Sequence, residues 1–465
     1  MLNDLPSSDK IANFVVYNSD LNYFNLRIMK QPIAREVLDG ILSRMDIADV
    51  SKATIRQSVA VTNELENVSG EKFVHLEIGV PGLKPSHIGV DAQKAALDRN
   101  VAAVYPNIAG EKPLKEAASR FIKAFIDADV PAECVIPTVG SMQGCFNLLL
   151  ECKQMNPSKP GVLFIDPGFP AQKSQAKVLG VPSESFDVYN YRAEKLGPKL
   201  EEYLSKGNIG AILYSNPNNP SWVCLTDDEL RTIGEMANRY DVVVLEDFAY
   251  LCMDFRSDLS KPFQPPYQVS VSRYTDNYIM MISASKIFSY AGERLGLVCF
   301  SPKMYHREYP RLRELYGMGR MGDNFVLTYL YAASSGTSHS AQYAMAAMME
   351  AAVDGRLDFV SDVKEYGRRA AITKEMFERH GFHIVYDRDN NVPISDGFYY
   401  TVSYKDLTNQ QLITNLLRCG IAAITLNTAG SDQAGIRACV SNLSTPDLFD
   451  KLDENLALFE KLVNE

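Results

Sequence analysis

A lysine in the second half of the chain has neighbours suited to binding an aldehyde cofactor that carries a phosphate. Lys286 follows the apolar run 278–282, with Ser283 and Ser285 directly before it and Arg294 eight residues after it. A lysine amine in a partly dry site can lose its proton and form a Schiff base, while hydroxyls and a guanidinium hold phosphate oxygens. These residue types at this spacing indicate pyridoxal phosphate. A lone lysine is more often a solvated surface charge, so the hypothesis depends on the rest of the chain.

An aspartate and a tyrosine follow another apolar run. Residues 241–246 lead into Asp247, and Tyr250 comes three positions later. A carboxylate there would keep a pyridine nitrogen protonated and strengthen the ring as an electron sink, while the phenol would donate to a ring oxygen. The alternative for Asp247 is an ordinary turn or helix-capping residue.

Three further segments carry side chains that suit the same cofactor. The rigid turn 215–222 contains Asn219, whose amide can bond a cofactor oxygen and a substrate carboxylate. Small residues around Ser141 and Met142 enter a predicted helix, whose first amides can hold phosphate. Phe169 follows a strand and offers a ring for stacking on a flat cofactor. Each segment alone also has a purely structural interpretation.

The elements that must position these side chains alternate between strand and helix. Near-continuous Val, Ile and Leu predict buried strands at 161–166, 209–214, 241–247, 278–282 and 295–300. Helices are predicted between them, including 226–240, where Thr226 and Glu229 form a capping box. This alternation predicts an α/β fold, a mainly parallel sheet with helices on both sides. Ligand groups in such folds gather at the carboxyl ends of the strands.

Changes in composition and periodicity along the chain predict four segments. Residues 1–35 are polar with scattered aromatics and are predicted to be an N-terminal arm, with a loose end as the alternative. Residues 36–80 are assigned to the small domain and 81–335 to the large cofactor-binding domain. Residues 336–465 complete the smaller α+β domain, with helices at about 338–352, 357–380 and from 446.

The order of these residues resembles that of the class I/II aminotransferases, pyridoxal-phosphate enzymes of fold type I, from about Glu77 to Asn442. The resemblance rests on the following segments and residues, in this order: 78–81, 105–110, the helix entry at Gly140, Phe169, Asn219-Pro220, 247–250, 283–286, Arg294 and Arg437. It implies a seven-stranded type of sheet and a Schiff base at Lys286, which then acts as the catalytic acid and base.

The resemblance also implies a role for each site residue. Asp247 would pair with the pyridine nitrogen, Asn219 and Tyr250 would bond the ring oxygen, and Phe169 would stack on the ring. The phosphate would be held by Ser141, Met142, Ser283, Ser285 and Arg294. Arg437 would clamp the substrate carboxylate through a bidentate fork, and Gly79 would approach the substrate through its backbone. Tyr105 would reach the cofactor phosphate of a neighbouring subunit, which implies a homodimer with shared active sites.

Two positions depart from the family pattern. Ser221-Trp222 stands where many relatives have Thr-Gly, so the only tryptophan of the chain either narrows the substrate pocket or packs outside it. Met142 is bulky at a position that is often small, which leaves its amide available but gives its side chain no clear role.

The resemblance predicts transfer of an amino group from an L-amino acid to a 2-oxo acid. A C–S lyase or another α,β-eliminating enzyme is the alternative, because the same lysine serves both routes. A ligand sensor that keeps the fold without catalysis is a third hypothesis. No second arginine that would select a dicarboxylic substrate is evident from the sequence.

The composition of the chain argues against several other classes of function. A formal charge of −10 in 465 residues lacks the basic footprint of a nucleic-acid-binding protein. The eight cysteines are scattered without metal-ligand spacing, which predicts reduced thiols in a cytoplasmic protein without a metal. No signal peptide and no membrane-spanning run are evident, so we expect a soluble protein that does not bind membranes.

Overall fold

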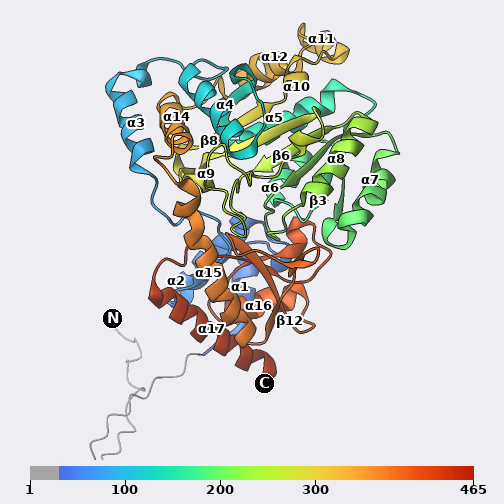
Figure 1. The fold of residues 1–465 in the computed structure, drawn as a ribbon. Helices are drawn as coiled ribbons and strands as arrows, with labels where there is room; N and C mark the ends of the chain where they lie inside the picture. Colours follow the sequence, from blue (N-terminus) through green and yellow to red (C-terminus); the bar gives the residue numbers. More distant parts are fainter. Residues whose placement is uncertain (1–30) are drawn as a thin grey trace, which may run out of the picture. The chain divides into compact units, whose positions relative to one another are not determined.

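A seven-stranded sheet forms the centre of the larger domain in the computed structural model, which describes residues 31–465 (Figure 1). Its strand order is β2-β8-β7-β6-β5-β3-β4, and β8 runs antiparallel to both of its neighbours while the other pairs are parallel. The mainly parallel sheet is therefore confirmed. The strands are β2 (Val135–Val139), β3 (Gly161–Asp166), β4 (Ser183–Asp187), β5 (Ile209–Ser215), β6 (Val243–Phe248), β7 (Tyr278–Ser283) and β8 (Leu295–Phe300).

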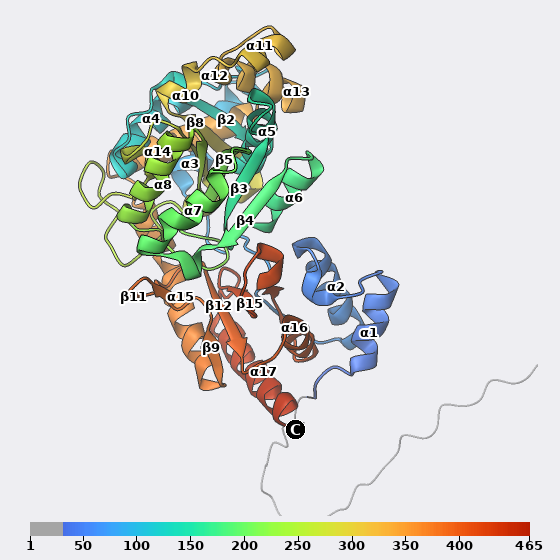
Figure 2. The same ribbon diagram turned by 90° about the vertical axis from the view of Figure 1, so that its right-hand side faces the viewer.

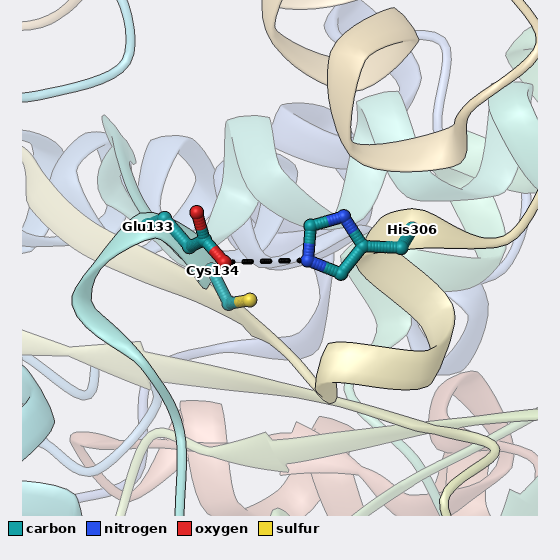
Figure 3. Close-up of side chains that lie close together, drawn as sticks. All are labelled: Glu133, Cys134 and His306. Carbon is teal, nitrogen blue, oxygen red and sulfur yellow. Dashed lines mark hydrogen bonds and ion pairs between the residues drawn. The ribbon is translucent and has the colours of Figure 1, made fainter.

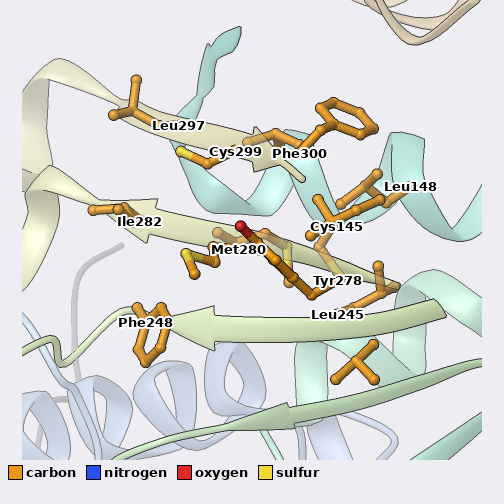
Figure 4. Packing of buried hydrophobic residues seen from close by; sticks show 14 of the residues in the cluster. Cys145, Leu148, Leu245, Phe248, Tyr278, Met280, Ile282, Leu297, Cys299 and Phe300 are labelled. Carbon is orange, nitrogen blue, oxygen red and sulfur yellow. The ribbon is translucent and has the colours of Figure 1, made fainter. Parts of the chain in front are cut away.

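The five strands predicted from apolar runs are buried along their whole length. Figure 4 shows side chains of β6, β7 and β8 beside those of α5, for example Met280 and Phe300 from the strands and Leu148 from the helix. The two edge strands were not predicted. Strand β4 is polar and partly exposed, and β2 contains Pro137, which an edge position tolerates because it needs fewer ladder hydrogen bonds.

Helices flank the sheet and give it the buried faces that its apolar strands require. The predicted capping box is confirmed at α8, where the hydroxyl of Thr226 accepts from the amide of Glu229 and the carboxylate of Glu229 accepts from the amide of Thr226. The helices of this part are α3 (His87–Asp98), α4 (Lys112–Ile126), α5 (Gly140–Met155), α6 (Pro170–Val178), α7 (Leu196–Leu204), α8 (Asp227–Tyr240), α9 (Ala284–Ile287), α10 (Pro302–His306), α11 (Pro310–Tyr316), α12 (Met321–Asn324), α13 (Tyr331–Ser334) and α14 (His339–Val353).

The smaller domain is built on an antiparallel sheet of order β14-β15-β12-β9 (Figure 2). Segments from both ends of the chain meet there, because β1 pairs in parallel with β13. The N-terminal elements are α1 (Arg35–Arg44), α2 (Ile55–Ser69) and β1 (Val74–His75). The C-terminal elements are α15 (Phe359–Arg379), β9 (Phe382–Ile384), β10 (Arg388–Asp389), β11 (Val392–Pro393), β12 (Tyr399–Tyr404), α16 (Asn409–Arg418), β13 (Ile421–Ala422), β14 (Ile424–Thr425), β15 (Ile436–Cys439) and α17 (Pro446–Asn464).

Buried side chains form one cluster around the large sheet and a second cluster in the smaller domain. Helix α14 packs on α3 and α4 and belongs to the first cluster, although the predicted boundary at 335/336 assigned it to the smaller domain. This packing argues for a later boundary, and the division at residues 80 and 335 stays a prediction. Most of the predicted arm, residues 1–30, lies outside the described residues. Between residues 31 and 465, no helix is both long and apolar enough to cross a bilayer.

Candidate active site

A cavity of about 460 Å³ lies at the carboxyl ends of β5, β6 and β7, beside the N-terminus of α5. Its volume is in the usual range for small-molecule sites. Twelve of the thirteen site residues predicted from the sequence line it, although they come from segments more than 350 residues apart: Gly79, Ser141, Met142, Phe169, Asn219, Asp247, Tyr250, Ser283, Ser285, Lys286, Arg294 and Arg437.

The amine of Lys286 lies inside this cavity, on the short helix α9 that follows β7. Its Nζ donates to the carbonyl oxygen of Gly79 at 2.6 Å. Burial lowers the pKa of Lys286 to about 8, and the positive charges of Arg437 and Arg294 act in the same direction. About a tenth of this amine is therefore neutral at pH 7, far more than for a solvated lysine, and the neutral form is the nucleophile.

The carboxylate of Asp247 is buried at the end of β6 and has only neutral partners among the described residues. Its Oδ2 accepts from Gln172 Nε2 at 2.8 Å, and its Oδ1 accepts from the amide of Ala249 at 3.1 Å. Burial raises the pKa of Asp247 to about 6. Because an ionised carboxylate is costly to bury without a positive partner, this site favours a bound cationic group such as a protonated ring nitrogen.

Tyr250, Tyr399 and Arg437 form a contiguous group on one wall of the cavity. The hydroxyl of Tyr250 donates to that of Tyr399 at 3.0 Å, and the guanidinium carbon of Arg437 lies 4.5 Å from the centre of the Tyr399 ring. Arg437 also donates to Asn219 Oδ1 at 3.3 Å and to the carbonyl oxygen of Glu77. Its Nε is buried without a hydrogen-bond partner among the described residues, which leaves a donor available to a ligand.

Another part of the cavity wall combines the first turn of α5 with Arg294. Gly140 begins α5 at φ 66°, a backbone conformation that favours glycine, and lies so near Arg294 that a Cβ there would be 2.7 Å from a guanidinium nitrogen. Ser283 caps α9 by accepting from the amide of Ser285 at 3.2 Å. Hydroxyls, helix amides and a guanidinium thus surround one space, which is the donor set expected for a phosphate.

Two residues discussed from the sequence lie outside the cavity. Tyr105 is 91% exposed and does not line the cavity of its own chain. Trp222 is fully buried and packs behind Tyr250, with ring centres 5.4 Å apart. A Cβ at Gly397 would overlap the indole, so the backbone lies directly against it. The packing interpretation of Trp222 therefore holds, and the pocket interpretation does not.

Gln172, Tyr399 and Arg56 are polar cavity residues that the sequence analysis missed. Gln172 lies only three positions after Phe169, so its neighbourhood was a usable signal. Tyr399 and Arg56 stand far from every predicted motif, on β12 and α2, and no local pattern distinguishes them.

One group of metal-ligand side chains comes together elsewhere among residues 31–465, formed by Glu133, Cys134 and His306 (Figure 3). The ring of His306 lies 3.3 Å from a carboxylate oxygen of Glu133, and both side chains are about half exposed. Burial raises the pKa of the Cys134 thiol to about 12, which opposes the thiolate that a metal needs. The group has little character of a metal centre. All eight cysteines are buried, and none forms a disulfide.

The sequence profile of the family "Aminotransferase class I and II" matches residues 71–452. The chain belongs to the class I and II aminotransferases. It is similar to an aspartate aminotransferase of Pyrococcus horikoshii, 27% identical over 57% of this chain and 63% of the relative. A probable N-acetyl-LL-diaminopimelate aminotransferase of Bacillus subtilis is 28% identical over 50% of this chain and 56% of the relative. The alignments with these two relatives thus span less than two thirds of their length.

Solved aminotransferases share the fold at low sequence identity. A Thermus thermophilus aspartate aminotransferase with maleate superimposes with a TM-score of 0.69 at 19% identity, covering 90% of this chain and 99% of that one. An alanine aminotransferase from Pyrococcus furiosus gives 0.70 at 18% identity, covering 89% and 98%. The predicted resemblance and fold class are both confirmed.

Class I and II aminotransferases use pyridoxal 5'-phosphate, and the residues of this cavity fit that cofactor. Asp247 is a buried carboxylate without a cationic partner among residues 31–465. The approach of Gly140 to Arg294 leaves space that a Cβ would fill. The amine of Lys286 has a lowered pKa in the same cavity. The amine, the carboxylate and the space beside Arg294 therefore match the aldehyde, the ring nitrogen and the phosphate of this cofactor.

Proposed function

We propose that the protein is a pyridoxal-phosphate-dependent aminotransferase that moves the amino group of an L-amino acid to a 2-oxo acid. The observation that carries this proposal is the buried amine of Lys286 in one cavity with Asp247 and Arg437. Family membership supports the same reaction, and relatives named as aminotransferases of aspartate and of N-acetyl-LL-diaminopimelate leave the substrate open.

The cofactor, when bound, supplies an aldehyde for covalent capture of amines and a ring that withdraws electrons. Lys286 would hold the aldehyde through Nζ, and its amine, which lies in the cavity, would take and return the proton at the substrate α-carbon. Asp247 would hold a proton on the ring nitrogen, and Gln172, which donates to this carboxylate, would orient it. Tyr250 would donate to the ring oxygen, and Phe169 would pack on the ring.

Arg437 orients the substrate by its α-carboxylate. The guanidinium stacks on the ring of Tyr399 and donates to Asn219. These two contacts pre-organise it for two parallel hydrogen bonds to a carboxylate. Gly79 lies directly against Tyr399, since a Cβ there would overlap the tyrosine hydroxyl, and its backbone lines the cavity where the substrate would bind. The residues that would hold the phosphate are Ser141, Met142, Ser283, Ser285 and Arg294.

The decisive experiment follows the absorption spectrum of the loaded protein during addition of single L-amino acids without a 2-oxo acid. Transamination predicts loss of the cofactor band with one equivalent of 2-oxo acid released. A persistent band with accumulating pyruvate and ammonia would instead identify a lyase, and no reaction with any amino acid would favour a ligand sensor. Lys286→Ala is the control and should remove the band and the reaction together.

We further propose a homodimer in which Tyr105 contributes to the partner's site, because this exposed ring does not line the cavity of its own chain. Two inactive variants, Tyr105→Ala and Lys286→Ala, test this when they are mixed and allowed to exchange subunits. In mixed dimers one site keeps its own lysine and receives an intact tyrosine, so a statistical mixture should recover about one quarter of wild-type activity. No recovery, despite proven exchange, would place Tyr105 outside the partner's site. The cytoplasmic location stays a prediction.

A further inference from the structure

A fourth cationic side chain lines the cavity, and the chemistry proposed above gives it no role. The cations are Lys286, Arg294, Arg437 and Arg56, whereas Asp247 is the one carboxylate among the described residues that line the cavity. Lys286, Arg294 and Arg437 are assigned to the aldehyde, the phosphate and the α-carboxylate, and Asp247 to the ring nitrogen. Arg56 is therefore a positive charge in excess of what the cofactor and the common part of an amino acid require.

Arg56 also lacks a partner within the described part of the chain. No hydrogen bond, ion pair or ring contact joins it to another residue of 31–465. The nearby exposed Lys52, by contrast, pairs with Asp49 at 3.6 Å and does not line the cavity. A guanidinium that is free at the edge of a binding cavity keeps its donors available to an anion.

The position of Arg56 on α2 argues against a role in helix stability. Thr54 and Gln57 form the capping box of this helix, and its first turn contains no acidic residue. The positive end of the helix dipole favours an acid and opposes a cation at this position. A cation here has an electrostatic cost for the helix, and together with the helix end it adds positive potential at the mouth of the cavity.

We propose that Arg56 binds an anionic group on the substrate side chain, so that the enzyme prefers amino acids with a side-chain carboxylate to their neutral counterparts. The inference rests on the proposed aminotransferase function. Ile55, Ile78 and Val80 line the cavity and provide an apolar wall for the methylene groups between the two carboxylates of such a substrate.

The test compares L-glutamate with L-glutamine, which has nearly the same shape without the charge, in the half-reaction followed at the cofactor band. The wild-type protein should react with glutamate at least tenfold faster at low concentration. Arg56→Gln should lower the rate constant for glutamate by about 10- to 100-fold, the range expected for one charge-assisted hydrogen bond, and leave glutamine within about twofold. Arg56→Lys should keep much of the preference, and Lys52→Gln should keep all of it.

Two outcomes would overturn the proposal: a wild-type protein that reacts equally with both amino acids, or an Arg56→Gln variant that loses both reactions in parallel. Reaction with neutral amino acids alone would refute the role of Arg56 and leave the aminotransferase function intact. No reaction with any amino acid would refute the function itself. The melting temperature of Arg56→Gln should not fall, because the substitution removes a cation from the first turn of a helix; a marked fall would identify a structural role instead.

Discussion

The lowered pKa of Lys286 predicts how the rate of cofactor capture by the cofactor-free protein depends on pH. Only the neutral amine attacks an aldehyde, so the second-order rate constant follows the neutral fraction of Lys286. With a pKa of about 8, that fraction is about 9% at pH 7 and about 91% at pH 9. The rate should therefore rise about tenfold over this interval and level off above pH 9. A solvated lysine of pKa 10.4 would rise about a hundredfold and would not level off.

The assay is stopped-flow mixing of cofactor-free protein with pyridoxal phosphate between pH 6.5 and 10, read at the absorption band of the bound cofactor. Arg437→Gln removes a positive charge that lowers this pKa, so its plateau should move to higher pH. A rate that still rises tenfold per pH unit above pH 9 would refute the reasoning, because it would require an amine of ordinary pKa.

A second buried lysine makes one control essential. Burial also lowers the pKa of Lys115 to about 8. Its amine donates to the carbonyl oxygens of Ala109 and Val135 at 2.8 and 2.7 Å, and it does not line the cavity. Lys286→Ala should therefore abolish capture, and any remaining pH-dependent capture would point to Lys115.

In the cofactor-free protein, burial raises the pKa of Asp247 to about 6, so its carboxylate is ionised above this pH and the affinity for pyridoxal phosphate should fall as pH drops through it. Asp247→Asn should lose most of the turnover rate and this pH dependence of cofactor affinity together; a dependence that persists belongs to another group. Tyr399→Phe removes the hydroxyl that is hydrogen-bonded to that of Tyr250 and should shift the pH midpoint of the cofactor spectrum, with KM within about threefold, since the ring still stacks on Arg437. Tyr399→Leu should also raise KM at least about tenfold, and equal KM values for the two variants would contradict the stacking role. Trp222→Ala should cost about 3–5 kcal/mol of unfolding free energy in denaturant titration, because the indole is fully buried. The folded fraction of this variant should keep the wild-type substrate preference. A changed preference would show that Trp222 contributes to the substrate site.

Much of the large sheet and most of the site could be predicted because their signals are local. A strand buried on both faces must be apolar along its length, as β3, β6 and β8 are. The residue that ends such a strand lies at the edge where ligands bind, which is how Asp247 was found, whereas Lys286 was found from the serines before it and Arg294 after it. The capping box of α8 could be predicted because its signal is also local and spans only four residues.

The tertiary structure alone decided the contacts made over long sequence separations. Tyr399 joins the site because β12 pairs with β15 and so brings its hydroxyl to Tyr250, 149 residues away. Arg56 joins it because α2 packs in the smaller domain and presents its first turn to the cavity.

The sequence by itself determined which strands would be buried, which side chains would end them, and hence the cofactor and the family. Whether Trp222 faced the substrate or the core, and whether α14 belonged to the large sheet, depended on which surfaces meet when the domains fold. Burial and periodicity act within one element, whereas packing partners are set by competition among all elements, so a single local pattern cannot specify them.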